Sequence, residues 1–365
     1  MVIGIDARES AAGKGRYVQE LLKRLPELAP DTEFYFYTKP GPDAPAVPSN
    51  VTLRPVSGSG PLWHARVANA ANKEANIYFS TVSYQTPQFL RLPFIQTVFD
   101  LIVFKPFATP QRWAKMNERT FIKRALGRAS GIFTISQATA DDLATIVPAS
   151  SGKITVTPLA ADTRFKPDYP EAKKGEVRKR LGIPPEFILF TGTIEPRKNL
   201  TRLVTAYEQL PTEIKRSHAL VLVGRKGWQY EPVFKAIEES PDRDRIIHAD
   251  SVSDEDLAVL YADCTMFCYP TLYEGFGLPV LEAMQSGAPV ITSNTSSLPE
   301  VGGDAVRYVE PASISSITDQ VHEVLKSEAV RRKMSADGLQ QARHFSWEQT
   351  ARQTLEVLQH AARPK

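Results

Sequence analysis

Cysteine is nearly absent from this chain of 365 residues, which contains only Cys264 and Cys268. Their spacing matches neither a zinc knuckle nor a redox pair, so neither kind of site is indicated. Both lie in or beside the apolar run Thr265–Tyr269. We therefore predict two buried free thiols.

Long apolar runs are absent as well. No run approaches membrane-spanning length, and Asp6 interrupts the opening apolar segment before a signal peptide could form. The net charge of +3 and the pI near 8.7 are too mild to indicate general nucleic-acid binding. With 42% hydrophobic and 23% charged residues, the composition is that of a globular protein long enough for two domains. We expect a cytoplasmic protein.

No Asp-x-Asp pair follows an expected strand in the way that would indicate a metal site. The nearest candidate, Asp254–Asp256, is more typical of a helix start, because Ser253 can cap the helix and acidic residues favour the positive end of its dipole. We expect neither a metal ion nor another cofactor.

Short apolar runs rich in β-forming residues alternate with longer helical patterns, which is typical of parallel sheets covered by helices. The alternation occurs twice, and between the two series Pro158–Pro185 indicates a linker followed by a helix. We predict an α/β fold of two doubly wound, Rossmann-like domains that face each other across a cleft, with ligands beyond the carboxyl ends of the strands. The expected strands are Val2–Ile5, Phe34–Tyr37, Ile77–Phe79, Phe94–Val98, Ile132–Ile135 and Ile154–Val156, then Phe187–Phe190, Ala219–Val223, Arg245–His248, Met266–Tyr269, Pro289–Thr292 and Val306–Val309.

The most informative segment is Tyr269–Pro289, in which a glycine-rich turn leads into a short helix. Gly275 and Gly277 let the backbone approach a ligand closely, while Pro279 and Gly287 suit the two ends of the helix. Free N–H groups at a helix start attract anions. A glutamate on each side of the turn could accept hydrogen bonds from sugar hydroxyls, so the segment predicts an enzyme that acts on a nucleotide sugar.

Glu274 and Glu282, eight positions apart around Gly-Phe-Gly-Leu-Pro, resemble the paired-glutamate signature of family 4 of the retaining glycosyltransferases, which have the GT-B fold. Other segments occur in the order that this resemblance requires and extend it over nearly the whole chain. They are Gly13–Tyr17 as the first glycine-rich loop, Phe190–Leu200 as the segment that grips the diphosphate, Ser296–Asp304 as the segment that closes the donor pocket, and Phe345–Trp347 as the bend into the last helix.

The resemblance implies a retaining, metal-independent glycosyltransferase with three parts. Residues 1–165 would bind the acceptor, residues 166–345 would bind the nucleotide sugar, and residues 346–365 would form a helix that packs back on the first domain. Retention of the anomeric configuration would follow either front-face attack by the acceptor or a covalent intermediate on Glu274, and both stay open.

By the same resemblance, Glu282 would bind the ribose hydroxyls and Glu274 would lie near the donor sugar. The alternative for Glu282 is an ordinary surface position, because the glycine turn interrupts the helical spacing of the pair. The backbone amides that would also meet the sugar belong to Gly275, Phe276, Gly277 and Leu278.

Arg197 and Lys198 are candidates to stabilise the departing diphosphate, because they follow a strand and the Gly192 turn and open the helix expected near Asn199. Cations at a helix start are unfavourable unless an anion is bound there. Many relatives carry an arginine directly after the strand-end glycine, where this chain has Thr193.

Arg225 and Lys226 follow another strand, Ala219–Val223. They either assist in binding the donor or form an exposed basic loop.

On the acceptor side, Gly13 and Gly15 would let the loop after the opening strand approach phosphates or the acceptor. Lys14 and Arg16 add positive charge, which predicts either an acceptor that carries phosphate, such as a lipid pyrophosphate, or a surface role.

A second feature of this side lies after Phe94–Val98, where many relatives read His-Asp-Leu and this chain has Phe99 and Asp100. Asp100 is a polar candidate for the site. Phe99 packs on the sugar ring or fills the wall of the cleft.

From Lys105 to Arg128, basic residues are interleaved with aromatic ones against the single acid Glu118. Such a stretch either lies on an anionic membrane, where lipid-linked acceptors are found, or forms a helix with Trp113, Met116 and Phe121 in the core and a solvated basic face. We favour peripheral contact with the inner face of the plasma membrane.

These features lead to the hypothesis of a hexosyltransferase that extends a glycan or lipid-linked acceptor in bacterial surface polysaccharide synthesis. Resemblance to mannosyltransferases puts GDP-mannose first as donor and a UDP-hexose second. The alternative is a catalytically silent subunit that binds a nucleotide sugar or lipid and supports a partner enzyme, an option that Phe99 and Thr193 keep open. Nothing in the sequence indicates an oligomeric state.

Overall fold

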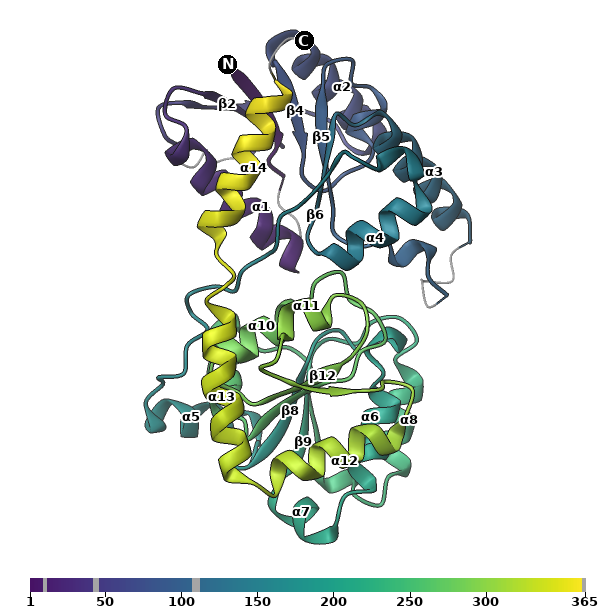
Figure 1. Cartoon of the computed structure of the whole chain (residues 1–365), viewed down its shortest axis with the longest axis vertical. Coiled ribbons are helices and arrows are strands. Elements are labelled where there is room, and N and C mark those ends of the chain that lie inside the picture. The colour runs from purple at the N-terminus through teal and green to yellow at the C-terminus, as the bar shows by residue number, and fades with distance from the viewer. Residues whose placement is uncertain (9–11, 42–45, 107–111, 363–365) are drawn as a thin grey trace. The chain divides into compact units, whose positions relative to one another are not determined.

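The computed structural model describes residues 1–8, 12–41, 46–106 and 112–362. The chain folds into two compact units, one formed by Met1–Leu159 with Ser346–Lys365 and the other by Ala160–Phe345 (Figure 1). The second unit thus begins at Ala160, a few residues before the boundary expected after residue 165.

The first unit is built on a seven-stranded parallel sheet with the order β3-β2-β1-β4-β5-β6-β7. Its central strands are buried on both faces, as expected for apolar runs in a sheet covered by helices. Its edge strand β3 was not expected from the sequence, because its alternating polar residues resemble a loop. The strands are β1 (Val2–Asp6), β2 (Glu33–Thr38), β3 (Val51–Pro55), β4 (Ile77–Ser80), β5 (Phe94–Val98), β6 (Gly131–Thr134) and β7 (Ile154–Val156).

The last helix of the chain belongs to the first unit, as predicted. Ser346 accepts a hydrogen bond from the Gln349 N–H and so caps this helix, and the Trp347 ring lies 6.3 Å from that of Tyr17. In Figure 1 the helix runs along α1. The helices of this unit are α1 (Ala12–Leu28), α2 (Gly60–Glu74), α3 (Arg112–Arg128), α4 (Gln137–Ile146) and α14 (Trp347–Ala361).

The second unit has a six-stranded parallel sheet with the order β10-β9-β8-β11-β12-β13. All six strands were expected from the sequence, with bounds that shift by one residue at most. They are β8 (Phe187–Thr191), β9 (Ala219–Val223), β10 (Ile246–Ala249), β11 (Met266–Tyr269), β12 (Val290–Ser293) and β13 (Arg307–Val309). The helices are α5 (Glu171–Leu181), α6 (Leu200–Glu208), α7 (Thr212–Ser217), α8 (Glu231–Glu239), α9 (Asp254–Asp263), α10 (Leu278–Gln285), α11 (Leu298–Gly302), α12 (Ile314–Leu325) and α13 (Glu328–Ala342).

Two smaller predictions are confirmed in this unit. Cys264 and Cys268 are buried free thiols, and burial raises the pKa of Cys268 to about 12. Ser253 caps α9 by accepting a hydrogen bond from the Asp256 N–H at 3.1 Å. The acidic residues there therefore act as helix-start residues.

The segment Gly13–Arg16 corrects one prediction, because it lies in the first turns of α1 and not in a loop. Tyr17, Val18, Leu21 and Leu25 follow at helical spacing and are all buried. Their burial outweighs the helix-propensity cost of the glycines, which is about 1 kcal/mol each relative to alanine.

Helix α3 corrects another. Phe121 is 41% exposed and so is not a core residue, whereas Ile122, Ala125 and Leu126 are buried. These three share one helical face, which fixes Phe121 on the outer side. The side chains of Trp113 and Met116 lie outside the described part of the chain.

Within the described ranges, none of the helices has the length and apolar character needed to cross a membrane.

Candidate active site

The loops after β8, β11 and β12 meet at one edge of the second sheet, because these strands are parallel neighbours in it. The loop after β8 contains the turn Pro196–Lys198, and the loop after β11 leads into α10. This edge therefore brings together segments that the sequence analysis treated separately.

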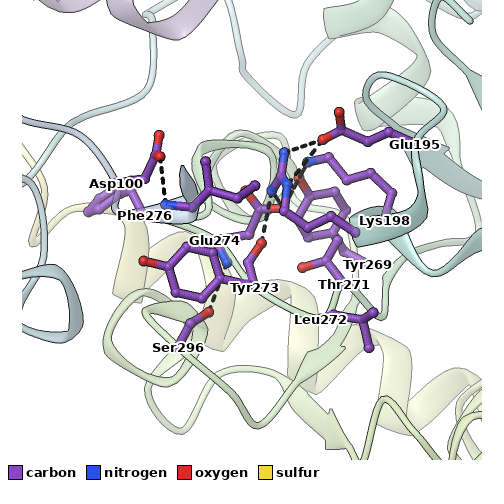
Figure 2. A network of polar contacts seen from close by, with 12 residues as sticks. Asp100, Glu195, Lys198, Tyr269, Thr271, Leu272, Tyr273, Glu274, Phe276 and Ser296 are labelled. Atoms are coloured by element: carbon purple, nitrogen blue, oxygen red, sulfur yellow. Dashed lines mark hydrogen bonds and ion pairs between the residues drawn. The ribbon is translucent and has the colours of Figure 1, made fainter. Parts of the chain in front are cut away.

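Glu274 is the centre of the site (Figure 2). Its Oε1 lies 2.7 Å from the Arg197 Nη1 and 2.7 Å from the Lys198 Nζ. The anion that the sequence analysis required beside these two cations is thus, in this structure, a carboxylate of the same chain. The structure brings three of the four predicted catalytic residues into direct contact.

Tyr269 completes this group at the end of β11. Its hydroxyl donates to the Glu274 Oε1 at 3.0 Å and accepts a short hydrogen bond from the Lys198 Nζ. Within the described part of the chain, the side-chain hydrogen bonds and ion pairs of Glu274 all fall on Oε1. None of these described contacts falls on the second oxygen, Oε2.

The charges of the site depend on one another. Burial is the largest single influence on Glu274 and would raise its pKa, but Lys198 and Arg197 outweigh it and lower the pKa to about 2. Burial lowers the pKa of Lys198, and the neighbouring carboxylate opposes that shift. Burial, reinforced by the charge of Glu274, raises the pKa of Tyr269 well above its usual value. Glu274 is thus ionised and Tyr269 neutral at physiological pH.

Most N–H groups of the Arg197 guanidinium have partners within the protein. Its Nε and Nη2 donate to the Glu195 carboxylate at 3.0 and 2.6 Å, and its Nη1 donates to the Tyr273 carbonyl at 2.8 Å. With the contact to Glu274, four of its five N–H groups have partners. Arg197 therefore joins the loops after β8 and β11.

The glycine-rich turn is held by two serines from the loop after β12. The Ser296 hydroxyl accepts a hydrogen bond from the Glu274 N–H at 3.0 Å, and the Ser297 hydroxyl lies 3.0 Å from the Glu274 carbonyl and 2.7 Å from the Phe276 carbonyl. Gly277 has a φ of 106° at the start of α10, a conformation that favours glycine. The turn is thus fixed before any ligand binds.

The predicted backbone-amide residues lie in this turn and at the first position of α10. Phe276 is buried and its ring meets that of Phe345 edge to face, with the centroids 5.7 Å apart. Its side chain therefore anchors the turn. Gly275 and Leu278 are partly exposed on either side.

Glu282 lies in α10 and is only 6% exposed, so the surface interpretation was wrong. The Tyr261 hydroxyl donates to its Oε2 at 3.3 Å and lies 2.6 Å from the Thr191 Oγ1 at the end of β8. A buried carboxylate with hydroxyl partners is unusual for a purely structural helix position.

The loops after β8 and β9 are interlocked through their backbones. Gly192 donates its N–H to Val223, and Ile194 donates its N–H to Arg225, each at 2.9 Å. Thr193 and Arg225 have exposed side chains on these loops. The structure thus places Arg225 beside the segment that carries Arg197.

In the first unit, Asp100 accepts a hydrogen bond from the Ile102 N–H at 3.1 Å and so supports the turn after β5. Phe99 is buried, with its ring edge to face with Tyr17 at 5.1 Å, and the Lys14 Nζ lies 5.4 Å from its centroid. Phe99 therefore packs within its own unit and forms a platform for Lys14.

Several residues of the network had no predicted role, although they lie inside the quoted motifs. Glu195, Tyr269, Ser296 and Ser297 are in this group. The signal that could have found Glu195 is its spacing of two from Arg197. The contact of Tyr269 with Lys198 spans 71 positions and depends on strand order.

Among the described residues, no group of three or more His, Cys, Asp or Glu side chains is arranged to hold a metal ion.

Comparison with known proteins identifies the family. The model of the family Glycosyl transferases group 1 matches residues 173–341. O-antigen chain mannosyltransferase B of Escherichia coli is 34% identical over 262 residues, which are 72% of this chain and 68% of that protein. The chain belongs to the group 1 glycosyltransferases. As a member, the protein is a transferase whose donor is a nucleotide sugar.

One further sequence relative and one solved structure are similar to this group 1 glycosyltransferase. The serotype-specific mannosyltransferase WbdA of E. coli is 35% identical over 232 residues, which are 63% of this chain but 28% of WbdA. Sucrose-phosphate synthase from Thermosynechococcus elongatus superposes with a TM-score of 0.78 at 21% identity, over 99% of this chain and 98% of that one. The latter supports the GT-B fold.

Proposed function

We propose that this glycosyltransferase transfers mannose from GDP-mannose to a glycan or lipid-linked acceptor in the synthesis of a surface polysaccharide. The observation that carries the proposal is the contact of Glu274 with Arg197 and Lys198 at the carboxyl edge of the second sheet. The similarity to two mannosyltransferases favours mannose over another hexose. A UDP-hexose is the second donor to test.

Lys198 is the residue best suited to bind the diphosphate. An ammonium has three N–H donors, and two of them bond Tyr269 and Glu274, which leaves one for a phosphate oxygen. Arg197 has one N–H group left, so its main effect is to hold Glu274. Arg225 and Thr193 lie on the neighbouring loops and would complete the contact with the phosphates.

Glu274 would receive a hydroxyl of the donor sugar on Oε2, since Oε1 is occupied by three donors. Glu282, in α10, would accept hydrogen bonds from the ribose. The backbone of Gly275–Leu278 would pass along the sugar, at the start of a helix whose dipole favours the negative diphosphate.

We infer retention through front-face attack. The acceptor oxygen bonds the anomeric carbon as the bond from that carbon to the diphosphate oxygen breaks, and the acceptor proton passes to the departing diphosphate. A carboxylate with a pKa of about 2 and three hydrogen-bond donors is a poor nucleophile, which disfavours a covalent intermediate on Glu274. The charge that develops on the diphosphate would be stabilised by Lys198 and the start of α10, without a metal ion.

On the acceptor side, Lys14 and Asp100 are the polar candidates. Gly13, Gly15 and Arg16 lie with Lys14 in the first turns of α1. The platform of Lys14 on Phe99 suits an acceptor that carries phosphate, because the ammonium is exposed and lies over an aromatic ring.

We further propose that the protein works at the inner face of the plasma membrane. Phe121, Lys123 and Arg124 are exposed next to one another on α3. An exposed aromatic ring beside basic residues is typical of helices that lie in the interface of an anionic membrane.

The test is a thermal-shift titration with GDP, UDP, ADP and dTDP, with and without magnesium, followed by transfer assays with the matching sugars. We expect a shift with GDP that does not require magnesium, because ligands that bind only the folded state raise its melting temperature. Glu282→Ala should weaken that shift. Transfer from a UDP-hexose alone would refute the choice of GDP-mannose, and nucleotide binding without turnover would support a silent subunit.

A further inference from the structure

Tyr269 is a tightly packed polar side chain of the site. Its ring stacks with those of Phe190 and Phe267, at 5.6 and 5.5 Å between centroids and within about 22° of parallel. The side chain is fully buried at the end of β11. The hydroxyl of Tyr269 therefore has a fixed position, set by the sheet.

This hydroxyl connects the two opposite charges of the site. A phenol has one O–H donor and can also accept a hydrogen bond. Here the donor bonds the Glu274 Oε1 at 3.0 Å, and the oxygen accepts from the Lys198 Nζ. The Nζ also lies 4.7 Å from the centroid of the Tyr269 ring. Both charged groups are thus attached to one rigid side chain.

We propose that Tyr269 is a positioning residue of the transfer reaction, which holds the Lys198 ammonium where the donor's diphosphate binds and turns the Oε2 of Glu274 toward the donor sugar. The inference rests on the proposed function of this site and adds a residue that acts through the other two.

The need for such a residue follows from the chemistry of lysine. Lysine is a point charge on a flexible stem, so its ammonium does not point in a fixed direction by itself. Without the phenol oxygen, the buried ammonium of Lys198 would keep the Glu274 carboxylate as its hydrogen-bond partner among the described contacts. It would be free to turn away from the diphosphate.

Removal of the hydroxyl also affects protonation. The charged groups that face Lys198 are Glu274, Glu195 and Arg197, and burial already lowers the pKa of Lys198. Loss of an acceptor for the ammonium lowers that pKa further. The ammonium would then lose its proton, and with it its attraction for the diphosphate, at a lower pH than in the wild type.

The experiment compares Tyr269→Phe with Tyr207→Phe. Tyr207 is a buried tyrosine of α6 in the same unit, and its hydroxyl donates to the His218 carbonyl at 2.8 Å away from the site. Both substitutions delete one buried hydroxyl and keep the ring. The readouts are kcat and KM from pH 6 to 10, and the Kd of the nucleoside diphosphate over the same range.

We expect Tyr269→Phe to lower kcat by on the order of ten- to a hundredfold, as for loss of a hydrogen bond to a charged group. The alkaline fall in kcat/KM, and the alkaline rise in Kd, should move to lower pH. Tyr207→Phe should leave both pH profiles in place. An unchanged kcat and pH profile in Tyr269→Phe would overturn the inference.

A double-mutant cycle provides a second measurement. In a Lys198→Gln background, Tyr269→Phe should cost clearly less than in the wild type, because one of the two groups through which Tyr269 acts is already gone and only its contact with Glu274 remains. Additive losses would show that Tyr269 acts independently of Lys198, against the inference.

The wild-type assays test the proposed function independently of the variants. Absence of both nucleotide binding and sugar transfer in the wild type would refute that function. The role of Tyr269 is tested by the ratio of the variant's kcat, KM and Kd to the wild-type values. The Kd of the nucleoside diphosphate can be measured even where the acceptor is unknown.

Discussion

The Nζ of Lys198 lies 2.7 Å from the Oε1 of Glu274, although 76 positions separate the two residues in the sequence. The contact depends on the adjacency of β8 and β11 in the sheet, since each residue lies on the loop that follows one of these strands. If β8 and β11 were not neighbours in the sheet, Lys198 and Glu274 would lie apart and would lose each other as partners.

Replacement of Glu274 by glutamine tests this pair. Glu274→Gln leaves two buried cations without their shared anion, and we expect a loss of about 3–5 kcal/mol in stability. Transfer should fall by at least a hundredfold, because the carboxylate that we propose as the partner of the donor sugar is gone. Differential scanning calorimetry and initial rates would measure the two effects. The exposed Glu328→Gln on α13, which breaks a surface pair with Arg332, should change neither.

The pH dependence of this contribution has a defined sign. The folded pKa of Glu274, about 2, lies below its ordinary value of 4.5. Its ion pairs therefore stabilise the fold fully above about pH 4.5, and this stabilisation is lost as the pH falls toward 2. Denaturant titrations of wild type and Glu274→Gln should differ by a constant amount at neutral pH and converge below pH 4.5. A gap that stayed constant from neutral pH down to pH 2 would contradict the low pKa.

The interlock of the loops after β8 and β9 predicts a strong effect for a small change. A Cβ at Gly224 would lie 2.0 Å from the Gly192 carbonyl oxygen, and the φ of Gly224 is 149°. Gly224→Ala should therefore cost about 2 kcal/mol or more and weaken nucleotide binding, because the loop that carries Arg197 must move. Thermal melts and nucleotide titrations would measure both.

Gly175→Ala is the matched control for that substitution. Gly175 lies in α5 of the same unit, and a Cβ there would contact only the Arg178 Nη2, at 3.9 Å. Alanine is the better helix former, so this variant should be as stable as the wild type or more so. Equal behaviour of the two variants would disprove the interlock.

Ser297 predicts an effect on donor affinity. Ser297→Ala removes the hydrogen bonds to the carbonyls of Glu274 and Phe276 and leaves these carbonyls less satisfied. We expect nucleotide-sugar affinity to fall about tenfold, as for loss of one buried hydrogen bond. Isothermal titration would show it, with Ser217→Ala on α7 as control because the described hydrogen bonds of its hydroxyl lie within or beside its own helix. Equal affinities in the two variants would refute this role.

The exposed basic residues of α3 predict membrane binding. Charge reversal at Lys123 and Arg124 should weaken binding to anionic vesicles by on the order of 30-fold or more, at about 1 kcal/mol per basic residue. Vesicle sedimentation at low and high salt would measure it. The same reversal at Arg332 and Lys333, both exposed on α13, should have little effect. Binding that ignores salt and both substitutions would argue against this surface.

The strands of the second unit could be predicted nearly residue by residue, because β8, β9, β11 and β12 are short apolar runs buried on both faces. The edge strand β3 could not, since only Val51 of its five residues is buried. The first turns of α1 were mistaken for a loop because two glycines lower the local helix propensity. Tertiary packing of Tyr17 and the apolar residues after it stabilises the helix there nonetheless.

The candidate site was predictable in its residues but not in its connections. Arg197, Lys198 and Glu274 were recognised from motif resemblance, yet the sequence contains no information on which oxygen or nitrogen meets which partner. Glu195 and Tyr269 show why: each matters through a single atom whose position depends on backbone geometry elsewhere in the fold.

Arg197, Lys198, Glu195 and Glu274 carry formal charges that sum to zero. A cluster with no net charge attracts anions only weakly at long range, so we expect free phosphate to bind there weakly. Only a ligand that can replace internal partners of the cations, and gain contacts elsewhere along α10, would compensate for that exchange. We therefore expect the ligand-free network to discriminate against simple phosphates in favour of the nucleotide-sugar donor.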